Sequence, residues 1–230
     1  GDHRDLHSFP TRRSFRSSGT TKGGDVSQLA FLKVIPSKRT VYLNEEVTLQ
    51  YKIYFRANIS GNEVLKLPEA VGCWVEEYPT ARRPAVYNET INNIRYNVAE
   101  IKKVAVFPSR DGKITISPLE LMVDIAVPRQ RPRDPFNLFD DFFSDPFSQV
   151  VKNKISSGAV ELTVVPLPVE GKPSDFSGLV GDFTIQSSLD RNTASTNEAI
   201  SLKIKLAGTG LLKMLNSLPL DFSPDFEVYD

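Results

Sequence analysis

The sequence predicts an all-β protein of the sandwich type. Apolar residues alternate in several short segments, and Pro, Gly and Asn/Asp turn signals separate these segments. No window of twelve residues outside 133–147 has a helical period. The chain of 230 residues is 40% hydrophobic and 24% charged, which is enough to bury a core. Its length fits one large domain or two small ones.

The clearest strand is predicted at residues 46–55. Five apolar side chains lie on one face of it, and Thr, Gln, Lys and Tyr side chains lie on the other; the apolar set is Val47, Leu49, Tyr51, Ile53 and Phe55. This period of two is typical of a half-buried strand.

Further strands follow in the chain. Residues 94–107 are expected to form one long strand or two joined strands, and Asp111-Gly112 is a hairpin turn signal. Residues 114–127 predict a bent strand, because Pro118 is compatible only with an edge or a bulge. Residues 159–165 predict the next strand.

An internal repeat indicates two domains. We expect a first domain over 28–165, a linker over 166–177 that contains Pro and Gly, and a second domain over 178–230. Residues 44–52 (NEEVTLQYK) match residues 197–205 (NEAISLKIK) in their turn and their alternation. Because the second segment is much shorter than the first, we expect the second domain to be incomplete.

We predict no folded structure for residues 1–27. They are rich in Arg, Ser and Gly and predict disorder. Residues 7–14 (HSFPTRRS) look like the translation of a sequencing-adapter oligonucleotide, so we interpret the segment as an assembly artefact. Both histidines of the chain, His3 and His7, lie within it.

Charge and hydropathy exclude several classes of partner. The 28 Lys and Arg residues balance 28 Asp and Glu residues, so electrostatics give no reason to expect nucleic acid or an anionic membrane surface. No run of about 18 apolar residues predicts a transmembrane helix.

Catalytic chemistry is scarce in this sequence. No histidine follows residue 27, which excludes Ser-His and Cys-His nucleophile pairs, and the single Cys73 excludes the usual zinc sites and an intrachain disulfide. Gly208-Thr209-Gly210 favours a sharp turn at a strand end over a phosphate-binding loop. We therefore expect no enzyme, no cofactor and no resident metal.

Cys73 itself leaves two interpretations open. It is either a small buried residue beside a core Trp74 or a redox-sensing thiol near Arg82 or Arg83.

One segment differs in composition from the rest. Residues 133–147 contain five Phe and four Asp residues and carry Asp-Pro-Phe at both ends, within an expected insertion at about 129–156. The segment is either a flap whose Phe side chains pack on the sandwich or a docking segment with aromatic anchors and an acidic rim. The candidate partner-binding residues are Phe136, Phe139, Asp140, Asp141, Phe142, Phe143, Asp145 and Phe147.

Several motifs occur in a characteristic order. They are Val41–Glu45, Val106–Pro108 followed by Gly112 and Ile116-x-Pro118, the Asp/Phe insertion, Pro166–Pro168 and Gly171–Phe183 (GKPSDFSGLVGDF). In this order they resemble the BatD family, the oxygen-tolerance proteins of bacterial aerotolerance operons.

The resemblance implies tandem immunoglobulin-like β-sandwich domains in a non-catalytic protein. It also implies a location on the periplasmic face of the inner membrane, with a signal peptide and a transmembrane anchor that this sequence does not contain. The implied partners are von Willebrand A-type and tetratricopeptide-repeat proteins. The implied interdomain joint contains Phe176, Gly178, Val180 and Gly181, where glycines allow close backbone approach.

Two functions are therefore weighed. The first is a scaffold or interaction module, in which Asp140, Asp141 or Asp145 would complete a Mg²⁺ site of a von Willebrand A-type partner. The alternative is a carbohydrate-binding or adhesive surface protein. Its stacking faces would be Trp74, Tyr78, Tyr87 and Tyr96, although Trp74 is expected in the core.

Overall fold

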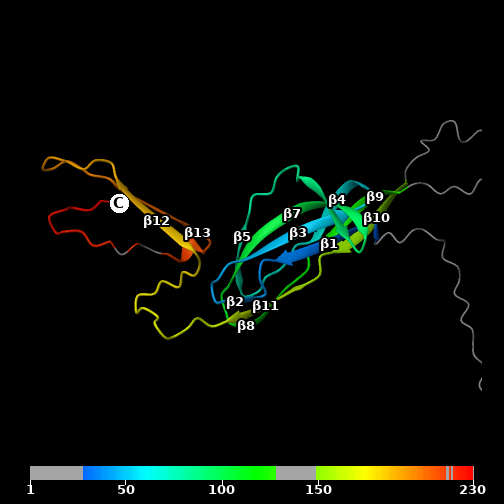
Figure 1. The fold of residues 1–230 in the computed structure, drawn as a ribbon, viewed down its shortest axis with the longest axis horizontal. Helices are drawn as coiled ribbons and strands as arrows, with labels where there is room; N and C mark the ends of the chain where they lie inside the picture. The colour runs from blue at the N-terminus through cyan, green and yellow to red at the C-terminus, as the bar shows by residue number, and fades with distance from the viewer. Residues whose placement is uncertain (1–27, 128–148, 216–217, 219, 230) are drawn as a thin grey trace, which may run out of the picture.

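Nearly all regular structure in the described part of the chain is β, which confirms the predicted class (Figure 1). The computed structural model describes residues 28–127, 149–215, 218 and 220–229. The strands are β1 (Ala30–Pro36), β2 (Thr40–Tyr42), β3 (Val47–Phe55), β4 (Asn58–Lys66), β5 (Cys73–Glu77), β6 (Val86–Ile91), β7 (Ile94–Pro108), β8 (Gly112–Ile116), β9 (Glu120–Val127), β10 (Gln149–Ser156), β11 (Val160–Val165), β12 (Phe183–Leu189) and β13 (Leu202–Gly208). One 3-10 helix, η3 (Leu212–Met214), follows β13.

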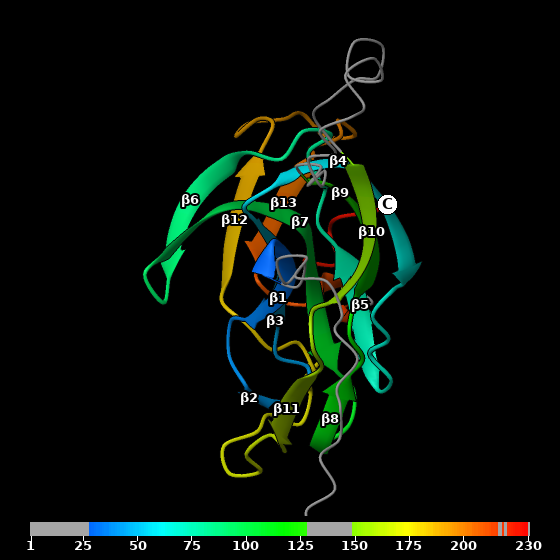
Figure 2. The same cartoon turned by 90° about the vertical axis from the view of Figure 1, so that its right-hand side faces the viewer.

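The described residues between 28 and 165, which we call the first unit, form the sandwich. One layer is the main sheet, in which the strand order is β1-β3-β7-β5 and β6 also pairs with β7. The other layer consists of two three-stranded sheets, β10-β9-β4 and β2-β11-β8. Figure 2 shows β8 and β11 toward one end of the first unit and β4, β9 and β10 toward the other.

Strand β7 organises the main sheet. It pairs with β3 on one side, and β6 and β5 share its other side, at residues 94–99 and 104–108 respectively. The register with β3 shifts at Tyr51, because Ile101 has no opposite residue and forms a bulge. The region predicted as one or two strands at 94–107 is therefore one strand with an irregular centre.

The core lies between the layers. The predicted inner residues Val47, Leu49, Tyr51 and Ile53 are buried in it, opposite branched aliphatic side chains of β8, β9 and β11. No polar or charged residue other than tyrosine is buried in the described residues. Burial of these apolar side chains is the main stabilising contribution to the sandwich.

The opposite face of β3 is not wholly solvated, contrary to the simple alternation. Tyr54 is buried there and stacks on Phe31, its cross-strand partner, with ring centroids 4.9 Å apart. Tyr96 packs edge-on against Phe31, with centroids 5.1 Å apart. Cross-strand aromatic pairs of this kind cover the outer face of the sheet.

Three sequence predictions are corrected by the pairing. Gly112 has a positive φ of 88° and follows a turn, but β8 pairs with β11 and not with β7, so the turn crosses between layers and makes no hairpin. The predicted bent strand at 114–127 is divided into β8 and β9 around Pro118. The expected insertion at 129–156 is too long, because residues 149–156 form β10 and pair with β9.

Residues 178–229, which we call the C-terminal unit, contain the antiparallel pair β12–β13 and η3. The internal repeat is visible in its backbone. Asn44 before β3 and Asn197 before β13 both have left-handed φ values, 63° and 68°. The carboxylates of Glu45 and Glu198 each accept a bond from the N–H three residues earlier, at 2.8 and 2.9 Å. The same residues therefore build the same turn twice.

Candidate functional site

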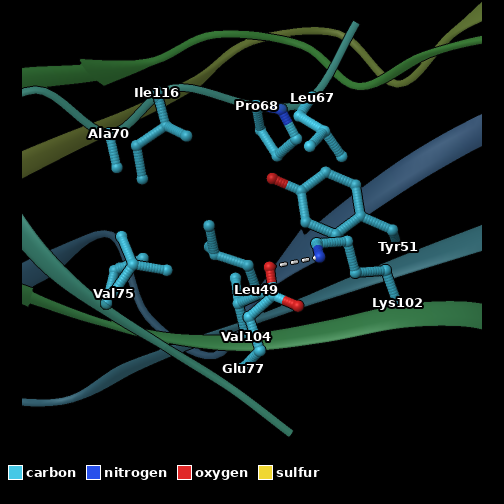
Figure 3. Close-up of a pocket in the computed structure, with 11 residues that line it drawn as sticks. Leu49, Tyr51, Leu67, Pro68, Ala70, Val75, Glu77, Lys102, Val104 and Ile116 are labelled. Atoms are coloured by element: carbon cyan, nitrogen blue, oxygen red, sulfur yellow. Dashed lines mark hydrogen bonds and ion pairs between the residues drawn. The ribbon is translucent and has the colours of Figure 1, made fainter. Parts of the chain in front are cut away.

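A partly open cavity of about 80 Å³ lies at the edge of the sandwich beside β5 (Figure 3). Its walls are mostly aliphatic and come from three places: the main sheet, β8 and the connection between β4 and β5. The lining residues are Leu49, Tyr51, Leu67, Pro68, Ala70, Val75, Glu77, Lys102, Val104, Val106 and Ile116. The Lys102 ammonium forms an ion pair with the Glu77 carboxylate at 2.6 Å, next to the cavity.

The Tyr51 hydroxyl is a buried polar group in the wall of this cavity. The residue is 1% exposed, and its hydroxyl has no hydrogen-bond partner among the described residues. Burial raises the pKa of Tyr51 to about 12, so the hydroxyl stays protonated in neutral solution. A buried hydroxyl without a partner costs about 1–3 kcal/mol, which a ligand atom or an ordered water can recover. Few polar groups in an apolar pocket are typical of a binding site.

Strand β5 separates this cavity from a second contact surface. Val75 and Glu77 line the cavity, whereas Trp74 and Glu76 point to the outer face of the main sheet. Successive side chains of a strand point to opposite faces, which explains the division. The same alternation in β7 places Val104 and Val106 inside and Ala105 and Phe107 outside.

The C-terminal unit contacts that outer face, and we call the contact the joint. Leu211 and Met214 pack on Ala105 and Phe107 of β7. Lys213 Nζ lies 2.6 Å from Glu76 Oε1.

The joint also holds the Trp74 side chain. Lys213 Nζ lies 5.4 Å from the centre of the Trp74 ring, and Trp74 Nε1 donates a bond of 2.7 Å to Glu76 Oε1. The joint thus combines an apolar cluster, an ion pair and a cation–π contact.

Close backbone packing within the C-terminal unit positions η3. A Cβ on Gly208 would lie 2.2 Å from the Asp182 carbonyl oxygen, and one on Gly210 would lie 2.1 Å from the Phe183 ring. These glycines let the chain turn at the end of β13 into η3, which agrees with the sharp turn predicted for Gly208-Thr209-Gly210.

The four predicted joint residues have three different placements. The carbonyl oxygen of Gly178 accepts a bond of 3.2 Å from Asn44 Nδ2 of the first unit, so this residue joins the two units. Gly181 instead packs against the backbone of Gly210 inside the C-terminal unit. Phe176 and Val180 line an open hollow formed by the linker itself.

The residues that make most of the joint were not predicted from the sequence. Glu76, Leu211, Lys213 and Met214 carry no motif, and their pairing follows from docking of two distant segments. The alternation of β5 was a usable signal, since it places Trp74 and Glu76 on one face.

The candidate partner-binding residues of the Asp/Phe segment lie outside the described residues. This applies to Phe136, Phe139, Asp140, Asp141, Phe142, Phe143, Asp145 and Phe147. Their docking role and the suggested Mg²⁺ contact of the aspartates stay predictions.

The aromatic side chains weighed for carbohydrate stacking are not equivalent. Tyr96 is buried, and Trp74 is 49% exposed, so the expectation of a core Trp74 is wrong. Its position on the outer face of β5 explains this exposure. Tyr78 and Tyr87 are exposed, but Lys103 and Lys52 lie over their rings at 4.6 and 5.5 Å.

Cys73 is half-buried and packs against the sandwich core. Burial raises the pKa of its thiol, and the positive charge of Arg110 opposes this in part. The nearby cation is therefore Arg110 rather than Arg82 or Arg83. A raised pKa keeps the sulfur as a thiol, which favours the packing interpretation over the redox one.

The described residues contain no cluster of His, Cys, Asp and Glu that could hold a metal ion. Within them, no helix is long and apolar enough to cross a membrane. Comparison of the chain with protein-family models, with curated proteins and with solved structures gave no match.

Proposed function

We propose that this protein is a non-catalytic interaction module of a membrane-associated aerotolerance complex. In this proposal it consists of tandem immunoglobulin-like sandwiches on the periplasmic face of the inner membrane. Its partners are von Willebrand A-type and tetratricopeptide-repeat proteins. The order of motifs that resembles the BatD family supports the compartment and the partners.

The observation that carries the proposal is the joint. Domains within one chain usually move relative to each other unless an extensive interface holds them together. Here Leu211 and Met214 provide apolar contact, Lys213 provides an ion pair, and Gly178 accepts a bond from Asn44. Such contacts fix the orientation of successive units, as a scaffold that presents several surfaces requires.

The repeated turn supports the tandem arrangement. Asn44-Glu45 and Asn197-Glu198 build the same local structure before β3 and β13. In addition, β1–β3 and β12–β13 are both antiparallel pairs in which the second strand follows that turn. This is the pattern expected when one type of unit occurs twice.

Copurification tests the proposal. The full chain is coexpressed with any von Willebrand A-type and tetratricopeptide-repeat proteins that its neighbouring genes encode, and complexes are isolated through a tag on the chain. We expect at least one of these proteins to coelute, and an unrelated von Willebrand A domain to be absent. Failure of a folded chain to retain any neighbour would contradict the proposal.

The role of the Asp/Phe segment is tested in the same assay. If Asp140, Asp141 or Asp145 completes a metal site of the partner, conversion of these three to Asn will abolish coelution that depends on Mg²⁺. Coelution that is insensitive to both the substitutions and a chelator would exclude the metal contact and leave the scaffold proposal intact.

A further inference from the structure

Strand β5 ends the main sheet with one open edge. Among the described residues it pairs with β7 on one side, and no strand pairs with its other side. The carbonyl oxygen of Gly72 accepts a hydrogen bond from the Ser109 N–H at 2.9 Å. The Tyr78 N–H donates a hydrogen bond to the carbonyl oxygen of Lys103 at 3.1 Å. Because alternate residues face the same neighbour, the main-chain groups of Trp74 and Glu76 also face β7.

It follows that the main-chain groups of Val75 and Glu77 face the open edge. Cys73 is two residues before Val75 and so faces away from β7 in the same way. Its N–H accordingly donates to the Ala70 carbonyl oxygen at 3.1 Å instead of to β7. Val75 and Glu77 are also the β5 residues whose side chains line the cavity (Figure 3). The open edge and the cavity therefore lie together on one strand.

An added strand would use both features at once. It would lie about 4.8 Å from β5, and every second side chain would point toward the interior of the sandwich. Main-chain bonds to Val75 and Glu77 would supply affinity, and the cavity would select one side chain, as in other recognition by strand addition.

The cavity limits which side chain fits. A cavity of about 150 Å³ holds benzene, so the 80 Å³ found here suits a group of roughly three or four heavy atoms. The walls require an apolar body, and the Tyr51 hydroxyl requires a hydrogen-bond partner. Threonine combines a methyl group with an oxygen and favours the extended conformation.

We propose that a partner protein adds an extended segment to the open edge of β5 and inserts a threonine side chain into the cavity beside Tyr51. This proposal rests on the proposed function in one respect: the ligand is a protein.

Peptide selection tests this proposal. The full chain is immobilised and panned with phage-displayed linear peptides of about ten residues. Enriched peptides are then synthesised with a fluorophore for measurements of Kd. We expect a consensus with a small β-branched residue, and a Thr peptide that binds more tightly than its Val counterpart.

Three variants and a control locate the binding. Ala70→Leu fills the cavity, Val75→Pro removes an N–H of the open edge, and Tyr51→Phe removes the hydroxyl. We expect the first two to weaken binding at least about tenfold, and Tyr51→Phe to remove the preference for Thr over Val.

Val71→Ala is the control and should bind normally, because Val71 is 73% exposed and lies outside the cavity lining. Circular dichroism verifies the fold of each variant, and Ala70→Leu suffices if Val75→Pro does not fold.

The outcomes separate this proposal from the proposed function. No enriched peptide, or equal binding by Ala70→Leu, would overturn it and leave ordered water as the occupant beside Tyr51. Coelution of the neighbouring proteins that survives Ala70→Leu and Val75→Pro would overturn it while the proposed function stands. Peptide binding that needs these residues, without coelution of any neighbour, would support it and contradict the proposed partners.

Discussion

Asn44 Nδ2 donates a hydrogen bond to the carbonyl oxygen of Gly178 at 3.2 Å and so connects the two units. Both residues have left-handed backbones, with φ values of 63° and 85°. Asparagine and glycine are the residues that tolerate this conformation best. Asn44 therefore has two roles: it forms the turn into β3, and it holds the C-terminal unit through Gly178.

Replacement of Asn44 by Gly separates these two roles. Asn44→Gly keeps a residue that accepts positive φ but removes the side-chain donor. We expect the joint to open about fivefold more often, because a neutral hydrogen bond contributes about 1 kcal/mol. Hydrogen exchange at residues 178–182 and 211–215 measures the opening. Asn197→Gly is the matched control, since Asn197 has the same φ in the repeated turn. Equal effects of the two variants would show that the turn, and not the bond to Gly178, holds the joint.

The single tryptophan of the chain reports on the joint. The hydrogen bonds from Lys213 and Trp74 lower the pKa of Glu76 below its usual 4.5. The stabilisation is therefore present above about pH 4.5 and is lost as the pH falls through the lowered pKa. We expect Trp74 fluorescence to change in that acid range, and Glu76→Gln to abolish the transition.

The neighbouring glutamate provides the control for this titration. Glu77 points to the cavity side and pairs with Lys102, so Glu77→Gln should leave the fluorescence transition in place. A transition that survives Glu76→Gln but disappears in Glu77→Gln would contradict the assignment.

Adjacent leucines test the apolar part of the joint. Leu211 is buried against Phe107, whereas Leu212 is exposed. We expect Leu211→Ala to lower the free energy of unfolding of the C-terminal unit by about 2 kcal/mol, and Leu212→Ala by less than about 0.5 kcal/mol. Denaturant titration followed by Trp74 fluorescence measures both. A loss in Leu211→Ala as small as the loss expected for Leu212→Ala would show that the cluster contributes no stability.

Local patterns were sufficient to predict some of the strands, among them β3, β7 and β11, and the turn before β3. The alternation of Val47, Leu49, Tyr51 and Ile53 predicted the inner face of β3, because a period of two fixes which side chains face the core. The Asn-Glu repeat predicted a shared turn, because its hydrogen bonds form within four residues.

Such local patterns could not predict which strands pair or which distant segments pack together. Gly112 indicates a turn, but only the packing of two layers decides that β8 pairs with β11. Tyr54 is buried by Phe31, a residue of another strand, and Trp74 is exposed because it lies on the outer face of β5. Lys213 and Glu76 lie 137 residues apart, so no local signal relates them. The cavity arises in the same way from segments that meet only in the fold.

Tyr51 and Tyr54 are both buried, but their hydroxyl groups differ. The Tyr54 hydroxyl donates to Glu89 Oε2 at 2.9 Å, whereas the Tyr51 hydroxyl has no partner among the described residues. Tyr51→Phe removes a group that burial penalises, so we expect the free energy of unfolding at pH 7 to stay unchanged or rise by up to about 1 kcal/mol. Tyr54→Phe removes a formed bond and should lower it by about 1 kcal/mol.

Unfolding at alkaline pH gives a second test of whether the Tyr51 hydroxyl lacks a hydrogen-bond partner or is bonded to an ordered water. The pKa of Tyr51 is raised from 10.0 to about 12, so the unfolded chain ionises this hydroxyl first, and the free energy of unfolding falls as the pH rises from about 10 to about 12. Urea titrations between pH 9 and 12 should therefore show a shallower loss of stability in Tyr51→Phe than in the parent chain. If Tyr51→Phe instead destabilises the protein by 1 kcal/mol or more at pH 7, an ordered water bonds to the hydroxyl and the cavity is already occupied.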